Sequence, residues 1–380
     1  MDRLLSPNEA KFWLLDSSAP MNSVVVIRRA GTVPIAMPRT FAIPEVRPGA
    51  HGRPRWGESR MPGVLRHVTE SSADDWLAVA QELLDVRVGT AGAPPWHAVV
   101  LRERESTTLV LAVNHALTDW RTSLVVGHAF LADVHPGDLA PPCEEMLPDG
   151  AYGDSDAAGL LDAWWSSRAG ARWEALGPER LTAILPPPEP TRFAVRTLGR
   201  EATGRVHAQC EEEGASLNSV LAVALRDVMG LDSVAHAVGM DRFIRPAPPS
   251  GPGLAVSHVF TRLERGEFWE AARENRATLF GEIKVGAAGD ALLSLPRLLL
   301  KPDTPVAYEK AVMTITGAPT VGAGGAAEDV SMELVVSSAR GGGGILIISY
   351  DDGCLQLIAG TAGAAAEVPL DAVVERLAHA

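Results

Sequence analysis

The chain has 380 residues, of which 46% are hydrophobic and 21% are charged, a balance typical of a folded globular protein and a length sufficient for two hydrophobic cores. Its formal net charge of −13 argues against a nucleic-acid-binding protein, which needs a concentrated basic surface. The three cysteines (Cys143, Cys210 and Cys354) are odd in number and far apart, so they predict neither a disulfide framework nor a zinc site.

Apolar residues do not form a run of the roughly 18 that a membrane helix requires. The first six residues are not followed by the apolar segment of a secretion signal. Paired cysteines, a His-x-x-x-His pattern and an Asp-rich loop are also absent from the sequence, so we expect no bound metal. From these observations we expect a cytoplasmic monomer without a membrane span and without a nucleic-acid partner.

The N-terminal half begins with a strong helix signal. Ser6 is a suitable cap, Pro7 fits the first turn, and Glu9 can close a capping box, which predicts a helix through about residue 15. The β-branched run at residues 24–27 (VVVI) predicts a buried strand. An amphipathic helix is predicted to begin within residues 72–75 (SADD).

A hairpin is predicted next, with strands at residues 97–102 and 107–114 joined by the polar turn 103–106 (ERES). The second strand leads directly into His115. A further helix is predicted to begin just after Asp119.

Near the midpoint, residues 186–190 (PPPEP) predict a stiff linker, because this spacing of prolines cannot continue a helix. We therefore expect an N-terminal lobe over residues 1–185 and a C-terminal lobe over residues 191–380. Further elements follow this linker. The pattern predicts strands near 193–195, 233–240 and 311–315, helices near 201–213, 217–229 and 267–283, and an antiparallel trio of strands near 330–338, 345–350 and 354–359.

Residues 114–119 (NHALTD) carry the clearest chemical signal. A strand that ends in a histidine and turns sharply into a helix can hold an imidazole at the floor of a cleft. A neutral imidazole can accept the proton of an attacking hydroxyl or amine, which makes His115 a candidate general base. The blander interpretation is a structural histidine at a strand end, with Asp119 serving only as a helix N-cap.

Six segments in this order resemble the HxxxD acyltransferases, the superfamily of chloramphenicol acetyltransferase, nonribosomal-peptide condensation domains and polyketide-associated acyltransferases. They are residues 5–9 (LSPNE), 94–100 (PPWHAVV), 114–119 (NHALTD), 217–225 (LNSVLAVAL), 314–317 (TITG) and 349–351 (SYD). The resemblance implies an α/β fold of the α+β sandwich type. Two chloramphenicol acetyltransferase-like lobes would surround a central tunnel, with a crossover segment near residues 311–330.

The resemblance also implies residue roles. His115 would be the base, and Asp119 would support the loop by pairing with an arginine, for which Arg242 and Arg245 are both candidates. Four residues are expected to line the substrate channel. These are Asn114, Trp120, Thr316 and Gly317.

This sequence departs from the family pattern at several positions. Asn114 replaces the first histidine of the usual doublet, and Trp120 replaces a glycine, so its indole must either pack into the core or narrow the tunnel. Ile315 stands where many relatives have asparagine. Residues 33–56, broken by five prolines, lack the amphipathic helix of relatives.

The expected activity is acyl transfer from a thioester to a hydroxyl or amine of a small acceptor, without a covalent acyl-enzyme. Acyl-CoA or an acyl carrier protein would supply the thioester as co-substrate, and no cofactor would be permanently bound. Two alternatives are a condensation-like protein that has lost transfer and serves as a scaffold or carrier-docking element, and a cyclase or eliminase that uses the same cleft.

Overall fold

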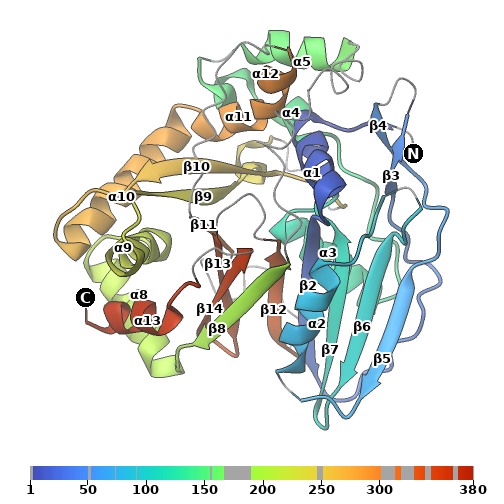
Figure 1. Cartoon of the computed structure of the whole chain (residues 1–380), viewed down its shortest axis with the longest axis horizontal. Coiled ribbons are helices and arrows are strands. Elements are labelled where there is room, and N and C mark those ends of the chain that lie inside the picture. The colour runs from blue at the N-terminus through green and yellow to red at the C-terminus, as the bar shows by residue number, and fades with distance from the viewer. Residues whose placement is uncertain are drawn as a thin grey trace.

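A computed structural model shows the fold (Figure 1). It describes residues 3–49, 53–72, 74–90, 92–154, 156–166, 190–245, 251–300, 313–317, 329–338, 344–362 and 367–379. Most of the predicted linker at 186–190 and most of the predicted crossover at 311–330 lie outside these ranges. The lobe boundaries at residues 185 and 191 therefore stay predictions.

The N-terminal half contains both strands and helices. They are β1 (Arg3–Leu4), α1 (Pro7–Ser18), β2 (Asn22–Ala30), β3 (Glu45–Pro48), β4 (Pro54–Gly57), β5 (Val64–Thr69), α2 (Asp75–Leu84), β6 (Trp96–Arg102), β7 (Ser106–Asn114), α3 (Trp120–Leu131), α4 (Cys143–Met146), the 3-10 helix η2 (Asp149–Tyr152) and α5 (Ala157–Ser166).

The C-terminal half has a similar mixture. Its elements are β8 (Thr191–Thr197), α8 (Arg200–Glu212), α9 (Leu217–Met229), β9 (Ser233–Gly239), the 3-10 helix η3 (Met240–Phe243), β10 (Val256–Arg262), α10 (Phe268–Lys284), α11 (Ala287–Leu292), α12 (Ser294–Leu300), β11 (Met313–Gly317), β12 (Val330–Ser337), β13 (Gly344–Asp351), β14 (Cys354–Ala362) and α13 (Leu370–Ala378).

Local sequence signals explain how α1 begins. The Ser6 hydroxyl accepts the Glu9 backbone N–H at 3.2 Å, and the Glu9 carboxylate accepts the Ser6 N–H at 2.8 Å, so the predicted capping box is confirmed. The predicted hairpin is also confirmed, because β6 and β7 pair antiparallel from Trp96 opposite Val113 to Arg102 opposite Thr107.

The described strands form a small sheet in the order β1-β4-β3 and a sheet of 11 strands, within which two groups can be distinguished. In the N-terminal group the neighbours are β12, β2, β7, β6 and β5, and in the C-terminal group they are β10, β9, β11 and β13, with β14 and β8 continuing from β13. Figure 1 shows the two groups on either side of β12. A brief ladder joins them, because β12 pairs with β13 only at Met332–Asp351 and Glu333–Tyr350. The predicted mixed α/β fold is therefore confirmed.

The strand β12 corrects one sequence prediction. The expected antiparallel trio places β12 beside β13, but β12 pairs along most of its length with β2, with Leu334 opposite Val26 and Val336 opposite Val24. All four of these side chains are fully buried. Burial against the apolar β2 explains the pairing, which the local strand pattern of residues 330–338 does not specify.

The alternation of side chains along β2 divides the N-terminal core in two. Val25 and Ile27 face a cluster that includes residues of α1 and α3, whereas Val24 and Val26 face a cluster that includes residues of α2. A separate cluster in the C-terminal half packs α8, α9 and α13 against β11, β13 and β14. Helices thus cover both faces of β2. This strand pairs with β7, and His115 follows the last residue of β7.

Candidate active site

His115 follows the last residue of β7, a strand buried between β2 and β6. The ladder with β2 ends where Asn114 lies opposite Asn22, and the His115 backbone N–H then donates to the Met21 carbonyl oxygen at 2.8 Å. Two neighbouring strands therefore fix the backbone on which the imidazole is carried. The turn that follows ends at Asp119, the N-cap of α3.

The contacts of the His115 ring differ at its two nitrogen atoms. Nδ1 lies 2.8 Å from the Thr118 carbonyl oxygen, which can only accept, so Nδ1 carries the proton in a neutral ring. In the described part of the chain, Nε2 has no hydrogen-bond partner. The Phe12 ring of α1 packs against the imidazole with a centroid distance of 4.3 Å. This arrangement leaves the Nε2 lone pair available as a base.

Electrostatics favour the same form of the ring. Burial is the main cause that lowers the pKa of His115 below its usual 6.5, and the nearby Lys11 ammonium lowers it further. The hydrogen bond to the Thr118 carbonyl and the charge of Asp119 oppose this shift but do not cancel it. Because its pKa lies below 6.5, the imidazole is neutral near pH 7. His115 is partly exposed to solvent.

Asp119 holds the turn together, but not through an arginine. One carboxylate oxygen, Oδ1, accepts the Thr122 N–H at 2.9 Å, and the other, Oδ2, accepts the Ala255 N–H at 2.9 Å. The Thr122 hydroxyl adds a bond of 2.6 Å to the Gly253 carbonyl oxygen. Asp119 therefore caps α3 and also ties it to the segment that precedes β10.

The predicted ion pair of Asp119 with Arg242 or Arg245 is wrong. Arg242 donates to the Gly239 carbonyl oxygen at 3.0 Å, and Arg245 donates to the Ile244 carbonyl oxygen at 2.7 Å. The physical reason is that two backbone N–H groups already satisfy the buried carboxylate at the positive end of a helix. An ion pair does join α3 to η3, but here the arginine belongs to α3 and the carboxylate to η3. Arg121 Nε lies 3.6 Å from Asp241 Oδ2.

Asn114 was expected in the substrate channel, and the structure corrects this. The residue is 1% exposed, because alternation along the strand directs it away from the His115 side. Its Oδ1 accepts the Ala116 N–H at 2.9 Å, and its Nδ2 donates to the Val88 carbonyl at 3.2 Å and to Asp16 Oδ1 at 3.3 Å. Asn114 thus supports the turn that carries His115 from behind.

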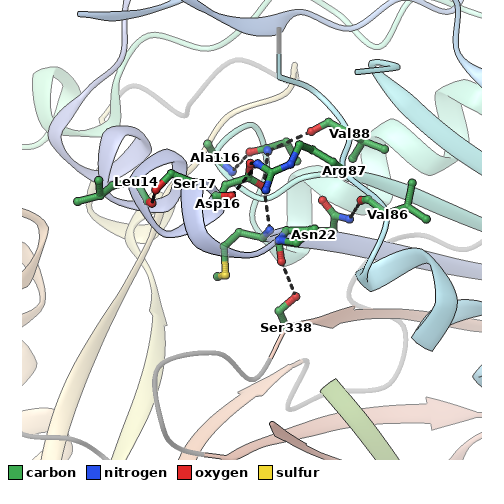
Figure 2. A network of polar contacts seen from close by, with 12 residues as sticks. Leu14, Asp16, Ser17, Asn22, Val86, Arg87, Val88, Ala116 and Ser338 are labelled. Atoms are coloured by element: carbon green, nitrogen blue, oxygen red, sulfur yellow. Dashed lines mark hydrogen bonds and ion pairs between the residues drawn. The ribbon is translucent and has the colours of Figure 1, made fainter. Parts of the chain in front are cut away.

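Figure 2 shows the polar network to which this support belongs. Arg87 donates from one nitrogen to the Asp16 backbone carbonyl and to its carboxylate, each at 2.7 Å. The same carboxylate accepts the Met21 N–H at 2.9 Å, so it fixes the residue whose carbonyl binds the His115 backbone. Asn22 extends the network by donating to the Val86 carbonyl at 2.6 Å.

The other three predicted channel residues have mixed outcomes. Trp120 is partly buried and packs against the core beneath α1 and α3, which is one of the two outcomes expected for it. Thr316 and Gly317 are partly exposed at the end of β11, which pairs in parallel with β13. Their place in a substrate channel stays a prediction.

Sequence reasoning missed the residues that α1 and β10 bring to this site. Phe12 contacts the imidazole, and the Lys11 ammonium lies 5.2 Å from the centre of the Phe12 ring. Asn8, on the same side of the helix, donates from Nδ2 to the Val256 carbonyl of β10 at 2.9 Å. The i, i+3, i+4 spacing of these three residues was a usable signal for a shared helix face.

The comparisons with known proteins give a consistent answer at the level of structure. No protein-family model matches the sequence, and no curated protein matches it. The first condensation domain of the calcium-dependent antibiotic synthetase, in complex with a substrate analogue, superposes with a TM-score of 0.64 at 16% identity, covering 100% of this chain and 96% of that chain. This chain has the condensation-domain fold.

Two further structures share this fold. Polyketide synthase associated protein 5 from Mycobacterium tuberculosis has a TM-score of 0.61 at 16% identity, covering 99% of this chain and 97% of that chain. The EpoB cyclization-docking bidomain of a nonribosomal peptide synthetase from Sorangium cellulosum has a TM-score of 0.55 at 13% identity, covering 100% of this chain and 83% of that chain. The predicted resemblance to the HxxxD superfamily is thus confirmed for the fold.

Among the described residues, each helix is too short or too polar to span a lipid bilayer. Within the same residues, histidine, cysteine, aspartate and glutamate side chains do not gather in a group of three or more that could hold a metal ion.

Proposed function

We propose that this condensation-like protein is an acyltransferase that moves an acyl group from a CoA or carrier-protein thioester to a hydroxyl or amine of a small acceptor. The observation that carries the proposal is the state of His115. Its Nδ1 is engaged by the Thr118 carbonyl oxygen at 2.8 Å, while Nε2 is free of partners in the described part of the chain. Burial keeps the ring neutral by lowering its pKa.

In the proposed reaction, Nε2 takes the proton of the acceptor hydroxyl or amine as the oxygen or nitrogen attacks the thioester carbonyl carbon. The tetrahedral intermediate then collapses with cleavage of the carbon–sulfur bond. The departing thiolate takes the proton back from the imidazolium, so the free thiol and the ester or amide are the products. Asp119 and Asn114 contribute by holding the turn, and they exchange no proton in this scheme.

The best sequence argument for the scaffold alternative is Trp120, whose indole could obstruct the substrate path where relatives have glycine. The indole packs against the core, so obstruction of the substrate path is a weaker argument for a scaffold, and the structure remains compatible with a working site. The cyclase alternative shares His115 and differs only in its substrate, which would be a tethered intermediate that attacks itself. Both reactions use the same base, so the assay described next has to decide between them.

The test is a transfer assay with short and long acyl thioesters, in which release of free thiol and formation of acylated acceptor are both measured. For His115→Ala we expect a fall in turnover of roughly a hundred- to ten-thousandfold, the usual contribution of a positioned general base. Folding should change little, because the ring is partly exposed rather than in a packed core.

A matched control removes an imidazole from an exposed position. His67 on β5 is exposed, so His67→Ala should leave transfer unchanged. If His115→Ala folds normally and keeps the parental rate, the proposed function with this base is wrong. Thiol release with a cyclic product and no acylated acceptor would instead favour cyclisation, whereas loss of water from a substrate that stays bound as its thioester would favour elimination.

A further inference from the structure

Lys11 is an ammonium group at the proposed site that the acyl-transfer scheme does not use. It belongs to the face of α1 that also carries Asn8 and Phe12. Asn8 docks this face on β10 through its bond of 2.9 Å to the Val256 carbonyl, and Phe12 docks it on the His115 ring at 4.3 Å between centroids. The position of Lys11 is therefore fixed from two sides, by elements that come from the two halves of the chain.

The ammonium lacks a counter-ion among the described residues. Its polar contact there is with the face of the Phe12 ring, at 5.2 Å from Nζ to the ring centre. Burial is the main cause that lowers the pKa of Lys11 to about 8. Its charge in turn contributes to lowering the pKa of both His115 and His258. The charge of Lys11 thus acts on two imidazoles, one that follows β7 and one within β10.

Glu144 is the carboxylate whose charge acts on Lys11, but it compensates the ammonium poorly. It forms no salt bridge with Lys11 in the described structure, and its Oε1 instead accepts the Asn8 N–H at 2.8 Å. Burial raises the pKa of Glu144 to about 7, so near neutral pH this group is protonated for much of the time. The site therefore keeps a positive charge that is not paired with a carboxylate in the described structure. Because Lys11 is partly buried, an anion bound there would replace hydration that the ammonium has lost.

We propose that Lys11 binds a carboxylate carried by one of the two substrates of His115. This proposal rests on the proposed function for the identity of the site. A phosphate is a poorer candidate, because in CoA and in carrier proteins the whole pantetheine arm separates the nearest phosphate from the reacting thioester. The carboxylate can belong to the acceptor, as in an amino or hydroxy acid, or to the acyl group, as in a dicarboxylic acid.

The two sources are separated by two sets of assays. In the first set, amino and hydroxy acids are compared with their primary amides as acceptors, with a neutral butyryl thioester as donor. In the second set, a glutaryl thioester is compared with its terminal amide as donor, with a neutral alcohol or amine as acceptor. We expect a lower KM for the carboxylate than for the amide in one set, and little difference in the other.

Substitutions then assign this preference to Lys11. Lys11→Met keeps the length of the stem but removes the charge, and it should raise KM for the carboxylate substrate by roughly ten- to hundredfold, as expected for loss of a hydrogen bond to a charged group. The same variant should leave KM for the amide nearly unchanged, and Lys11→Arg should restore much of the preference. The matched control is Lys284→Met, at an exposed position in α10.

A binding measurement keeps this proposal independent of turnover. Calorimetry on the intact chain compares N-acetylated amino acids, and a non-reacting glutaryl thioether, with their amides. Carboxylate-selective binding should persist in His115→Ala and disappear in Lys11→Met. If this pattern is found without any transfer, the anion site stands and the proposed function fails.

Two results would overturn the proposal while leaving the proposed function intact. One is His115-dependent transfer with equal KM and equal binding for carboxylates and amides in both sets of assays. The other is an equal fall in kcat for all substrates in Lys11→Met, which would assign the ammonium to the transition state rather than to substrate recognition.

Discussion

The Nδ1 atom of His115 lies 2.8 Å from the carbonyl oxygen of Thr118, three residues further along the chain. This contact selects the tautomer of the neutral ring and points Nε2 away from the turn. A strand end supplies the histidine and a helix N-cap terminates the turn. The geometry of the proposed base therefore depends on the whole turn between β7 and α3, and we expect substitutions that loosen this turn to reduce acyl transfer.

The first prediction concerns the pH dependence of acyl transfer. Since only the neutral imidazole can accept a proton, the rate should fall as pH decreases through the pKa of His115. Burial places this pKa below 6.5, so the acid limb of kcat/KM should lie below pH 6.5. Steady-state kinetics from pH 4.5 to 8 at constant ionic strength measure it. An acid limb well above pH 6.5 would contradict the neutral, desolvated state of the ring.

The second prediction separates the observed role of Asp119 from an arginine pair. Asp119→Asn places an amide donor where Oδ2 now accepts the Ala255 N–H, so it should lower the free energy of unfolding by roughly 1–3 kcal/mol. Arg242→Ala and Arg245→Ala should each change it by less than about 0.5 kcal/mol, as for most exposed positions. Urea denaturation measures all three. An equal loss in an arginine variant would restore the ion-pair interpretation.

Much of the fold near the site was predictable because it depends on short-range signals. The capping residues of α1, the apolar run of β2 and the hairpin of β6 and β7 each express a local preference that tertiary packing preserves. The same is true of the position of His115 at a strand end and of Asp119 at a helix start.

The remaining parts depend on contacts between distant segments. The carboxylate of Asp119 is satisfied by Ala255, 136 residues away, ahead of a strand that the pattern of residues 256–262 did not reveal. A buried carboxylate requires partners, but nothing in the local sequence says whether an arginine or a backbone N–H provides them. Lys11 was missed for a similar reason, since the imidazoles on which its charge acts, His115 and His258, are far from it in the sequence.

The third prediction tests the buried support behind the base. Asn114→Ala removes the acceptor of the Ala116 N–H and the donor to Val88, so it should lower the free energy of unfolding by roughly 1–3 kcal/mol and reduce kcat more than it changes KM. Asn114→Asp should be worse, because it brings a second carboxylate beside Asp16. Thermal denaturation and steady-state kinetics provide the comparison. Unchanged stability and kcat in Asn114→Ala would show that the network does not position the turn.

The fourth prediction concerns Trp120→Gly, which introduces the glycine typical of the HxxxD acyltransferases that the sequence resembles. Because the indole packs against the core, its removal should lower the free energy of unfolding by roughly 1–3 kcal/mol through lost apolar burial. It should not extend the range of acyl thioesters that are accepted. A panel of short and long acyl thioesters, assayed below the melting temperature of the variant, measures this range. Gain of a long-chain donor would mean that the indole narrows the substrate path.

The fifth prediction concerns Gly317, the last residue of β11. Its φ of +113° is a conformation that other residues rarely adopt, and an added Cβ would lie 2.1 Å from the Ile348 carbonyl oxygen of the neighbouring β13. Both the backbone strain and the collision must be relieved by movement of the strand end, so Gly317→Ala should lower the free energy of unfolding by roughly 1–3 kcal/mol or more.

A matched substitution gives the opposite sign. Gly204 lies inside α8, where an added Cβ would meet no atom within 4 Å, so Gly204→Ala should raise the free energy of unfolding by about 0.5–1 kcal/mol. Chemical denaturation of both variants measures the contrast. If Gly317→Ala is as stable as the parent, the close approach of β11 and β13 does not require glycine. If the variant is destabilised but keeps its kinetics below its melting temperature, Gly317 acts through the sheet alone, and its predicted place in the substrate channel is wrong.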